Sequence, residues 1–330
     1  KYDNKLRKFI SEKSRIEKFV ISHKRTFTEA TVETCIIILS NSLPDNSFIV
    51  ERWDQEPNNS YSVNINQINN KNNYIFPVYS DESVRKIVEK IKCAEIKLQD
   101  IAEVIWGVKV YEKEKDIPPQ KGDESINKVF HSKLKTKPSH RPLIGGKEIN
   151  RYLLNWNQGF IDYGKWLAAP RNPSWFDGER IVVREVTAKG IIQATYIHDD
   201  FVFSNSVDGI RLISDEFNLK ALLAILNSKL ISFYNLNTSA NAFKGSFPKV
   251  LLQDLRELPI PKMREDQLIH LENNCNQLLI LYKNRQEAML QGTKEQIQNQ
   301  INYFENKINE IVYQQYNLTK PEIEIIERSL

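Results

Sequence analysis

Three groups of residues in this sequence have types and spacings that could support chemistry, and the first is a set of charged residues. Asp81 is followed by Glu95 and Lys97, and two carboxylates with a lysine can hold a divalent metal ion and activate water. The spacing is loose for such a site, however, and an aspartate directly before an apolar helical repeat is typical of a helix N-cap. We therefore predict no metal-dependent nuclease site and no catalytic residue in this chain.

The second group is the three cysteines, Cys35, Cys93 and Cys275. They lie far apart, and none has a second cysteine or a histidine at the spacing of zinc ligands, so we predict no metal site. Cys35 lies in an apolar run and Cys275 in a helical repeat. An odd number of such residues is typical of free, buried thiols in a reducing compartment, and we expect a cytoplasmic protein.

The third group combines cations with aromatic side chains. Residues 131–151 hold six Lys/Arg against one acidic residue, and lysines alternate from Lys133 to Lys137. In an extended segment these lysines would share one face, a geometry that suits phosphate contacts. Between Tyr163 and Arg180, aromatic residues alternate with cations, which favours stacking on bases and binding of phosphates. The structural alternatives are a solvated loop and aromatic residues packed beneath a long loop.

These patterns lead us to expect double-stranded DNA as the partner, although the net charge of the whole chain is only +4. The candidate contacts to the DNA backbone are Lys133, Lys135, Lys137 and Arg141. The candidates for reading base edges are Arg171, Arg180, Arg184, Lys189 and Lys244. Lys165 completes the set of candidate DNA-binding residues.

Apolar periodicity predicts an α+β fold, with short strands in the first three quarters of the chain and helices at its end. The expected elements are a basic amphipathic helix at 3–18, a short strand at 19–21, a buried strand at 27–39, a helix at 81–93, a loop at 112–128, strands at 178–185, 191–197 and 207–212, and a helix at 215–234. The last 68 residues predict an antiparallel helical hairpin, with a helix stop at Gly292 and capping boxes that begin at Thr293 and Thr319. Since no apolar run is long enough for a membrane span, we expect no membrane contact.

Two stretches resemble known families. Leu6 and Arg7, followed by the pattern F-x-x-A-x-V-x-T-x-I-x-I from Phe27 to Ile38, resemble the closing strands of adenine-N6 DNA methyltransferase domains. The catalytic motif of that family, Asn/Asp-Pro-Pro-Tyr/Phe, does not occur here, because Pro118 and Pro119 stand between Ile117 and Gln120. The glycine-rich cofactor loop does not occur either. We therefore expect a non-catalytic fragment of a longer enzyme, as the first residue, Lys1, also suggests.

The second resemblance covers about residues 97–262. LIGGKEINRY at 143–152, IVVR at 181–184, LLAILNSKL at 222–230 and LPIP at 258–261 resemble, in this order, the TaqI-like C-terminal specificity domain. That domain is the target-recognition part of type II (type IIG-like) restriction–modification enzymes. The resemblance implies sequence-specific DNA binding that positions an adenine for a methyltransferase domain of the same polypeptide. S-adenosylmethionine would bind that parent enzyme, and we expect no cofactor in this chain.

We therefore expect four regions: the tail of a methyltransferase α/β sheet at 1–42, a connector with one helix at 43–96, a mixed α/β target-recognition domain at 97–262, and bracing helices, typical of a coiled-coil hairpin, at 263–330. Two alternatives remain. LPIP at 258–261 followed by a long helix is also similar to type I specificity subunits, although these carry two recognition domains in tandem. The second alternative is a protein-interaction scaffold that dimerises through its helical hairpin. Its mass in solution would then rise with protein concentration.

Overall fold

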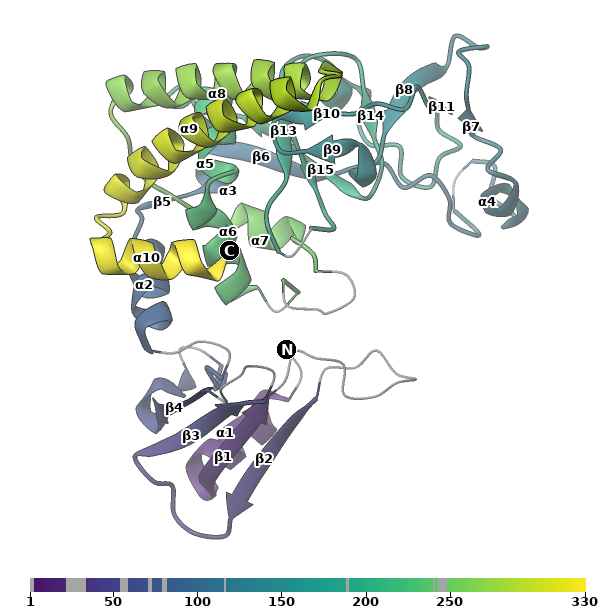
Figure 1. Cartoon of the computed structure of the whole chain (residues 1–330). Coiled ribbons are helices and arrows are strands. Elements are labelled where there is room, and N and C mark those ends of the chain that lie inside the picture. Colours follow the sequence, from purple (N-terminus) through teal and green to yellow (C-terminus); the bar gives the residue numbers. More distant parts are fainter. Residues whose placement is uncertain are drawn as a thin grey trace. The chain divides into compact units, whose positions relative to one another are not determined.

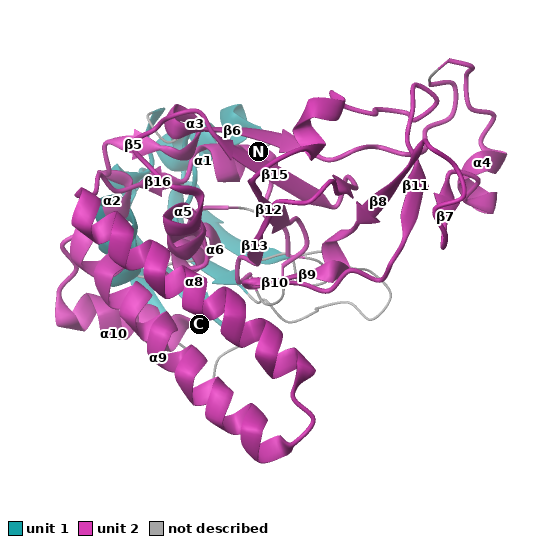
Figure 2. Ribbon diagram, turned by 90° about the horizontal axis from the view of Figure 1, so that it is seen from above, with its two compact units in different colours: residues 1–90, 243–247 teal, residues 91–242, 248–330 magenta. Residues whose placement is uncertain are grey.

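The structure is a computed structural model, and it describes residues 3–21, 34–53, 59–70, 73–78, 82–115, 117–187, 190–239, 241–242 and 248–330. The expected N-cap Asp81 and the first half of the expected strand at 27–39 lie outside these residues. The chain forms two compact units, residues 1–90 with 243–247 and residues 91–242 with 248–330, which Figure 2 shows in different colours. Each unit combines helices with small sheets, so the expected α+β class holds at this level.

Unit 1 is a four-stranded sheet with one helix before it (Figure 1). Its elements are α1 (Asn4–Lys13), β1 (Arg15–Ile21), β2 (Cys35–Ser40), β3 (Ser47–Arg52) and β4 (Asn59–Asn64). The sheet order is β2-β1-β3-β4, with β1 antiparallel to β2 and parallel to β3. The sheet therefore continues across the boundary expected at residue 42, because β3 pairs with β1 and β4 pairs with β3.

Two expectations for unit 1 are wrong. The first helix ends at Lys13 and not at residue 18, and Ile16 is buried in β1 instead of extending a helical face. The apolar strand β2 is exposed along most of its length, and Cys35 is an exposed thiol. Its apolar run predicted burial because such runs are typical of strands covered on both faces. Here β2 is an edge strand that the described residues leave uncovered.

Unit 2 contains two four-stranded sheets and two ribbons of two strands. The first sheet has the order β13-β12-β15-β6 and is antiparallel throughout. The second has the order β14-β8-β11-β7, and the ribbons are β10-β9 and β16-β5. The strands are β5 (Ile96–Lys97), β6 (Ala102–Trp106), β7 (His131–Ser132), β8 (His140–Ile144), β9 (Ile149–Asn150), β10 (Leu153–Leu154), β11 (Phe160–Asp162), β12 (Arg180–Arg184), β13 (Ala194–Ile197), β14 (Val202–Phe203), β15 (Val207–Leu212) and β16 (Pro259–Ile260). The strands expected at 178–185, 191–197 and 207–212 correspond to β12, β13 and β15.

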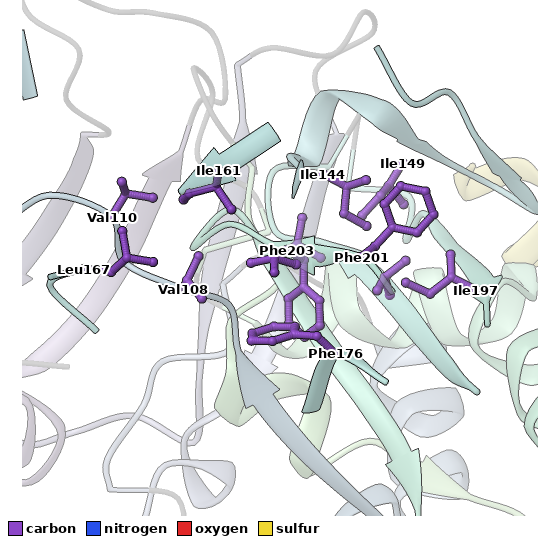
Figure 3. Packing of buried hydrophobic residues seen from close by; sticks show 13 residues of the cluster. Val108, Val110, Ile144, Ile149, Ile161, Leu167, Phe176, Ile197, Phe201 and Phe203 are labelled. Carbon is purple, nitrogen blue, oxygen red and sulfur yellow. The ribbon is translucent and has the colours of Figure 1, made fainter. Parts of the chain in front are cut away.

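The core between these two sheets is aliphatic and aromatic (Figure 3). Phe176 and Phe203 meet edge to face at its centre, with ring centroids 5.1 Å apart. Gly107 allows the chain to pass close to this core: a Cβ atom there would lie 2.1 Å from the carbonyl oxygen of Ser204. Any side chain at position 107 would therefore push β6 away from the strand that carries Phe203.

The helices of unit 2 differ from the expected ones in two places. They are α2 (Glu82–Lys92), which spans the division between the units, α3 (Leu98–Ile101), α4 (Asp123–Asn127), α5 (Leu219–Leu226), α6 (Lys229–Thr238), α7 (Leu252–Arg256), α8 (Glu265–Glu287), α9 (Gln291–Gln315) and α10 (Lys320–Ser329). The single helix expected at 215–234 is two helices, because Ser228 caps α6 and the amide of Asn227 bonds to Ala194. The loop expected at 112–128 contains α4.

The C-terminal helices α8 and α9 form the expected hairpin and pack on the rest of unit 2, with α8 against α5 and α9 against α6. Its turn lies at residues 288–290, so Gly292 does not stop a helix but stands in the first turn of α9. The capping box at Thr319 is confirmed, since the Glu322 carboxylate accepts from the backbone N–H of Thr319 at 2.6 Å. A partly buried ion pair between Arg151 and Glu305, 2.7 Å long, joins α9 to the segment between β9 and β10. The helices therefore brace the body of unit 2.

Candidate nucleic-acid interface

Three of the four candidate backbone-contact residues, Lys133, Lys135 and Lys137, lie on residues 128–137, which we call the lysine arm, whereas Arg141 lies on β8. Figures 1 and 2 show β7 and α4 at one end of unit 2, away from the C-terminal helices. Tyr111 anchors the base of the arm. Its hydroxyl accepts from the backbone N–H of Phe130 at 3.2 Å and lies 2.9 Å from Nδ1 of His131. Burial raises the pKa of Tyr111 and lowers that of His131, so both rings are held uncharged where they stack.

The turn that carries the lysines is not extended. Residues 133–139 form bends and a turn between β7 and β8, so the expectation of three lysines on one face is wrong. Lys137 bends back to the carboxylate of Asp162, 2.5 Å away. Burial alone would raise the pKa of Asp162, but hydrogen bonds from Lys137 and Ser139 lower it, and the ion pair holds Lys137 against β11.

The remaining cations of the arm point into solvent. Lys128, Lys133 and Lys135 are exposed, and none makes an ion pair with a described residue. Lys165 is likewise exposed and without an ion pair among these residues, and it follows the Asp162 that contacts Lys137. Residues 128–141 contain five Lys/Arg and no acidic residue. An unpaired lysine costs little to bring to a phosphate, because no internal ion pair has to break first.

The candidate base-reading arginines have a different environment, and Arg180 is the clearest case. It is fully buried on β12, where its guanidinium donates to the carbonyls of Gly178, Asp199 and Phe201 at 2.5 to 2.8 Å. Burial, followed by the positive charge of Arg211, lowers the pKa of Arg180 to about 10. The prediction that Arg180 reads a base is contradicted by this geometry, since β12 is buried on both faces from Arg180 to Val183 and leaves the Arg180 side chain no exposed surface.

Arg141 and Arg211 surround Arg180 and are also paired internally. Arg141 forms ion pairs with Asp177, at 2.9 Å, and with Asp200. Its guanidinium lies 5.3 Å from the ring centre of Tyr163. Arg211, which the sequence patterns did not single out, donates to the carbonyl of Asp177 and lies 5.0 Å from the ring of Trp175. The alternation of aromatics and cations therefore builds internal cation–π contacts here, the structural alternative to base stacking.

Arg171 and Arg184 each donate hydrogen bonds to other residues of the chain. Arg171 donates to the carbonyls of Trp106 and Gly107 at 3.0 and 3.2 Å, and its guanidinium lies over the Trp106 ring. Arg184 is half-buried and donates to the amide oxygen of Gln193 at 3.3 Å. Lys189 and Lys244 lie outside the described residues. We call Arg141, Arg171, Arg180 and Arg211 the arginine cluster.

The sequence patterns also missed Asp208, an acidic residue in the interior of unit 2. Asp208 on β15 is 1% exposed, and neither carboxylate oxygen has a hydrogen-bond partner among the described residues. Burial, aided by the negative charge of Glu185 and opposed by Arg256, raises its pKa to about 8. Position 208 lies within a β-strand pattern, which signals burial but not whether a carboxylate is paired.

The described part of the chain holds no group of three or more His, Cys, Asp or Glu residues placed to bind a metal ion. Among the same residues, no helix is both long and apolar enough to cross a membrane. Among the described residues, the exposed lysines Lys128, Lys133, Lys135 and Lys165 suit binding of a polyanion.

Comparisons with known proteins agree with the resemblance found in the sequence. Residues 141–260 match the model of the TaqI-like C-terminal specificity domain, which confirms that resemblance over a shorter stretch than expected. The chain is 27% identical over 288 residues to a Methanocaldococcus jannaschii protein named "Putative type II restriction enzyme and methyltransferase RM.MjaORFECS2P". The match covers 82% of this chain but only 23% of the relative.

Solved structures give a similar result for the fold. The type IIL restriction–modification enzyme MmeI, solved in complex with DNA, is similar over 96% of this chain with a TM-score of 0.59 and 11% identity. The chain covers 46% of the MmeI chain. The type IIG restriction endonuclease BpuSI is similar over 95% of this chain and 45% of its own, with 10% identity and a TM-score of 0.40, which is too low to carry an argument.

Proposed function

We propose that this chain, whose residues 141–260 match a TaqI-like specificity domain, binds duplex DNA and recognises a target sequence for a restriction–modification adenine-N6 methyltransferase. The observation that carries the proposal is the lysine arm, where Lys133 and Lys135 are exposed and make no ion pair with a described residue, in a segment without acidic residues. The arm directly precedes the stretch that matches the specificity family. Relatives named as type II and type IIL restriction–modification enzymes support the same reading.

In this proposal the lysines supply affinity and not sequence specificity. Lys128, Lys133, Lys135 and Lys165 neutralise phosphates and release counterions, so binding weakens as salt rises. Base edges are read by other side chains: the half-buried Arg184 is one candidate, and Lys189 and Lys244, which lie outside the described residues, stay candidates. The arginine cluster holds the two sheets together beneath that surface. Arg171 contributes to base reading only if its bonds to the Trp106 and Gly107 carbonyls open.

Methyl transfer is assigned to another part of the parent enzyme. The chain has neither the Asn/Asp-Pro-Pro-Tyr/Phe motif nor a glycine-rich cofactor loop, so we place S-adenosylmethionine and the flipped adenine in a methyltransferase domain outside it. Residues 1–42 of unit 1 are proposed as the tail of that domain, since Leu6 and Arg7 on α1 and the pattern 27–38, which ends in β2, carry the resemblance to its closing strands. This assignment makes the methyltransferase domain of the same polypeptide a partner of the chain.

Selection from a random-sequence duplex pool at two salt concentrations tests the proposal. The chain should retain DNA at low salt and release most of it at high salt, and the bound fraction should be enriched in one short motif. Retention without an enriched motif would leave a non-specific basic surface. No retention at low salt would contradict DNA binding, and a mass that rises with protein concentration would then favour the dimerising scaffold.

A further inference from the structure

The lysine arm also exposes a large apolar side chain at its turn. Leu134 is 69% exposed and stands between Lys133 and Lys135, which are both exposed. Moving a leucine side chain from water into an apolar environment is favourable, so the exposure of Leu134 at this turn is unfavourable in the free protein. A single exposed leucine is common on protein surfaces, so what distinguishes Leu134 is its held backbone and the lysines on both sides of it.

The backbone on both sides of Leu134 is held by side chains. The Ser132 hydroxyl donates to the carbonyl of Leu134 at 2.7 Å and accepts from its backbone N–H at 3.1 Å. Nδ1 of the buried His140 lies 3.0 Å from the same carbonyl and 3.2 Å from the backbone N of Thr136. If Nδ1 of His140 carries the proton, it donates to the Leu134 carbonyl; if it does not, it accepts from the Thr136 N–H. Either bond ties the turn to β8, so Leu134 is presented before any ligand binds.

The charges around Leu134 indicate what this side chain meets. Residues 128–141 carry five Lys/Arg and no acidic residue, which complements a polyanion. Apolar side chains of DNA-binding proteins can insert as wedges between base steps, partly unstacking them. A wedge held in a fixed backbone loses little conformational entropy on binding.

We infer that Leu134 is a wedge that inserts at a base step of duplex DNA, while Lys133 and Lys135 contact the phosphates on either side. The inference rests on the proposed DNA binding and adds a local distortion of the duplex to it. Lysine contacts alone would leave the bases stacked, so the two arrangements differ in a measurable property of the DNA.

The test compares Leu134→Ala and Leu134→Phe with the matched control Ile126→Ala. Ile126 on α4 is 81% exposed but has no lysine directly beside it. The probe is the duplex enriched from the random pool, or a duplex of arbitrary sequence if none is enriched, with 2-aminopurine placed at successive positions. Base unstacking raises the fluorescence of this analogue. Thermal unfolding of each variant checks that it is folded.

The wild-type chain should raise the fluorescence at one step, and Leu134→Phe should keep that signal. Leu134→Ala should abolish it and weaken binding by about tenfold without changing the salt dependence, because no phosphate contact is removed. Ile126→Ala should behave as wild type.

Wild-type binding without a fluorescence rise, or a Leu134→Ala variant equal to wild type, would overturn the wedge while leaving DNA binding intact. Loss of self-association in Leu134→Ala with unchanged DNA affinity would assign the leucine to a protein contact instead. Absence of wild-type binding would overturn the proposed function and the wedge together.

Discussion

The arginine cluster and the lysine arm contain the same kinds of residue, cations beside apolar or aromatic side chains, but only the arm leaves its charges available. Arg180 is fully buried with three carbonyl partners, whereas Lys133 and Lys135 are exposed and have no ion pair among the described residues. The difference teaches that residue type and spacing do not decide whether a cation binds DNA. What decides is whether the fold has already given that cation a partner.

The largest effect should follow from loss of the Arg180 side chain. Arg180→Ala leaves the carbonyls of Asp199 and Phe201 without their donor and opens a cavity, so the free energy of unfolding should fall by about 3 to 5 kcal/mol. Chemical denaturation measures this loss, with Arg184→Ala on the same strand as the control. A stable Arg180→Ala variant that no longer binds DNA would restore Arg180 as a base-reading residue and remove the contrast between the two regions.

Asp208 shows how burial controls an interior charge. Its pKa is raised to about 8, above the unfolded value of about 3.9, so its contribution to stability is fully present below pH 4 and is lost as pH rises through 8. Asp208→Asn should therefore be more stable than wild type at pH 8, on the order of 2 kcal/mol, and should lose this advantage near pH 4. Denaturation curves over this range test it. A variant less stable than wild type at pH 8 would mean that the carboxylate is ionised and paired.

A smaller effect is expected at the base of the lysine arm. Tyr111→Phe removes the hydroxyl that accepts from the Phe130 N–H and bonds to His131, while the stacked ring remains. Since a single hydrogen bond contributes about 1 kcal/mol, we expect a loss of that size, seen as faster hydrogen exchange at Phe130. Exchange rates unchanged from wild type would show that ring stacking alone anchors the arm.

The smallest effect should come from the one lysine of the arm that is already paired. Lys137→Ala breaks an ion pair in which Lys137 is largely exposed and Asp162 is buried, and we expect the free energy of unfolding to fall by about 1 kcal/mol, the upper end for exposed pairs. Its DNA affinity should stay within about threefold of wild type, because Lys137 has to leave Asp162 to reach a phosphate. Titration with a labelled duplex measures this, and a tenfold loss would place Lys137 with the free lysines.

Local sequence patterns predicted the elements of this fold better than their surroundings. The strand patterns at 178–185, 191–197 and 207–212 predicted β12, β13 and β15. The Thr319 capping box marked the start of α10. The pattern between 215 and 234 predicted one helix because apolar periodicity continues through Asn227 and Ser228. These two residues instead use their side chains for a tertiary bond and a cap, which competes with helix continuation.

In the candidate site, too, the sequence predicted where the cations lie but not which partners they have. The basic composition of 131–141 located the arm from the sequence alone, but the pairing of Lys137 with Asp162 and of Arg141 with Asp177 depends on contacts between distant residues. Arg180 has the alternation of a surface strand, yet its partners come from the turn before β12 and from residues 199–201. Sequence spacing contains no information about such long-range partners.

The salt dependence of DNA binding by the triple variant Lys133→Ala, Lys135→Ala, Lys165→Ala tests the central claim most directly. If these lysines contact phosphates, the slope of log K against log salt should become shallower by about three units, while the unfolding temperature stays that of wild type. The matched control is Lys283→Ala, Lys294→Ala, Lys307→Ala, which removes three cations from the C-terminal hairpin and should leave the slope unchanged. A slope equal to wild type in the Lys133, Lys135 and Lys165 variant would contradict the claim that the exposed lysines of the lysine arm, together with Lys165, bind DNA.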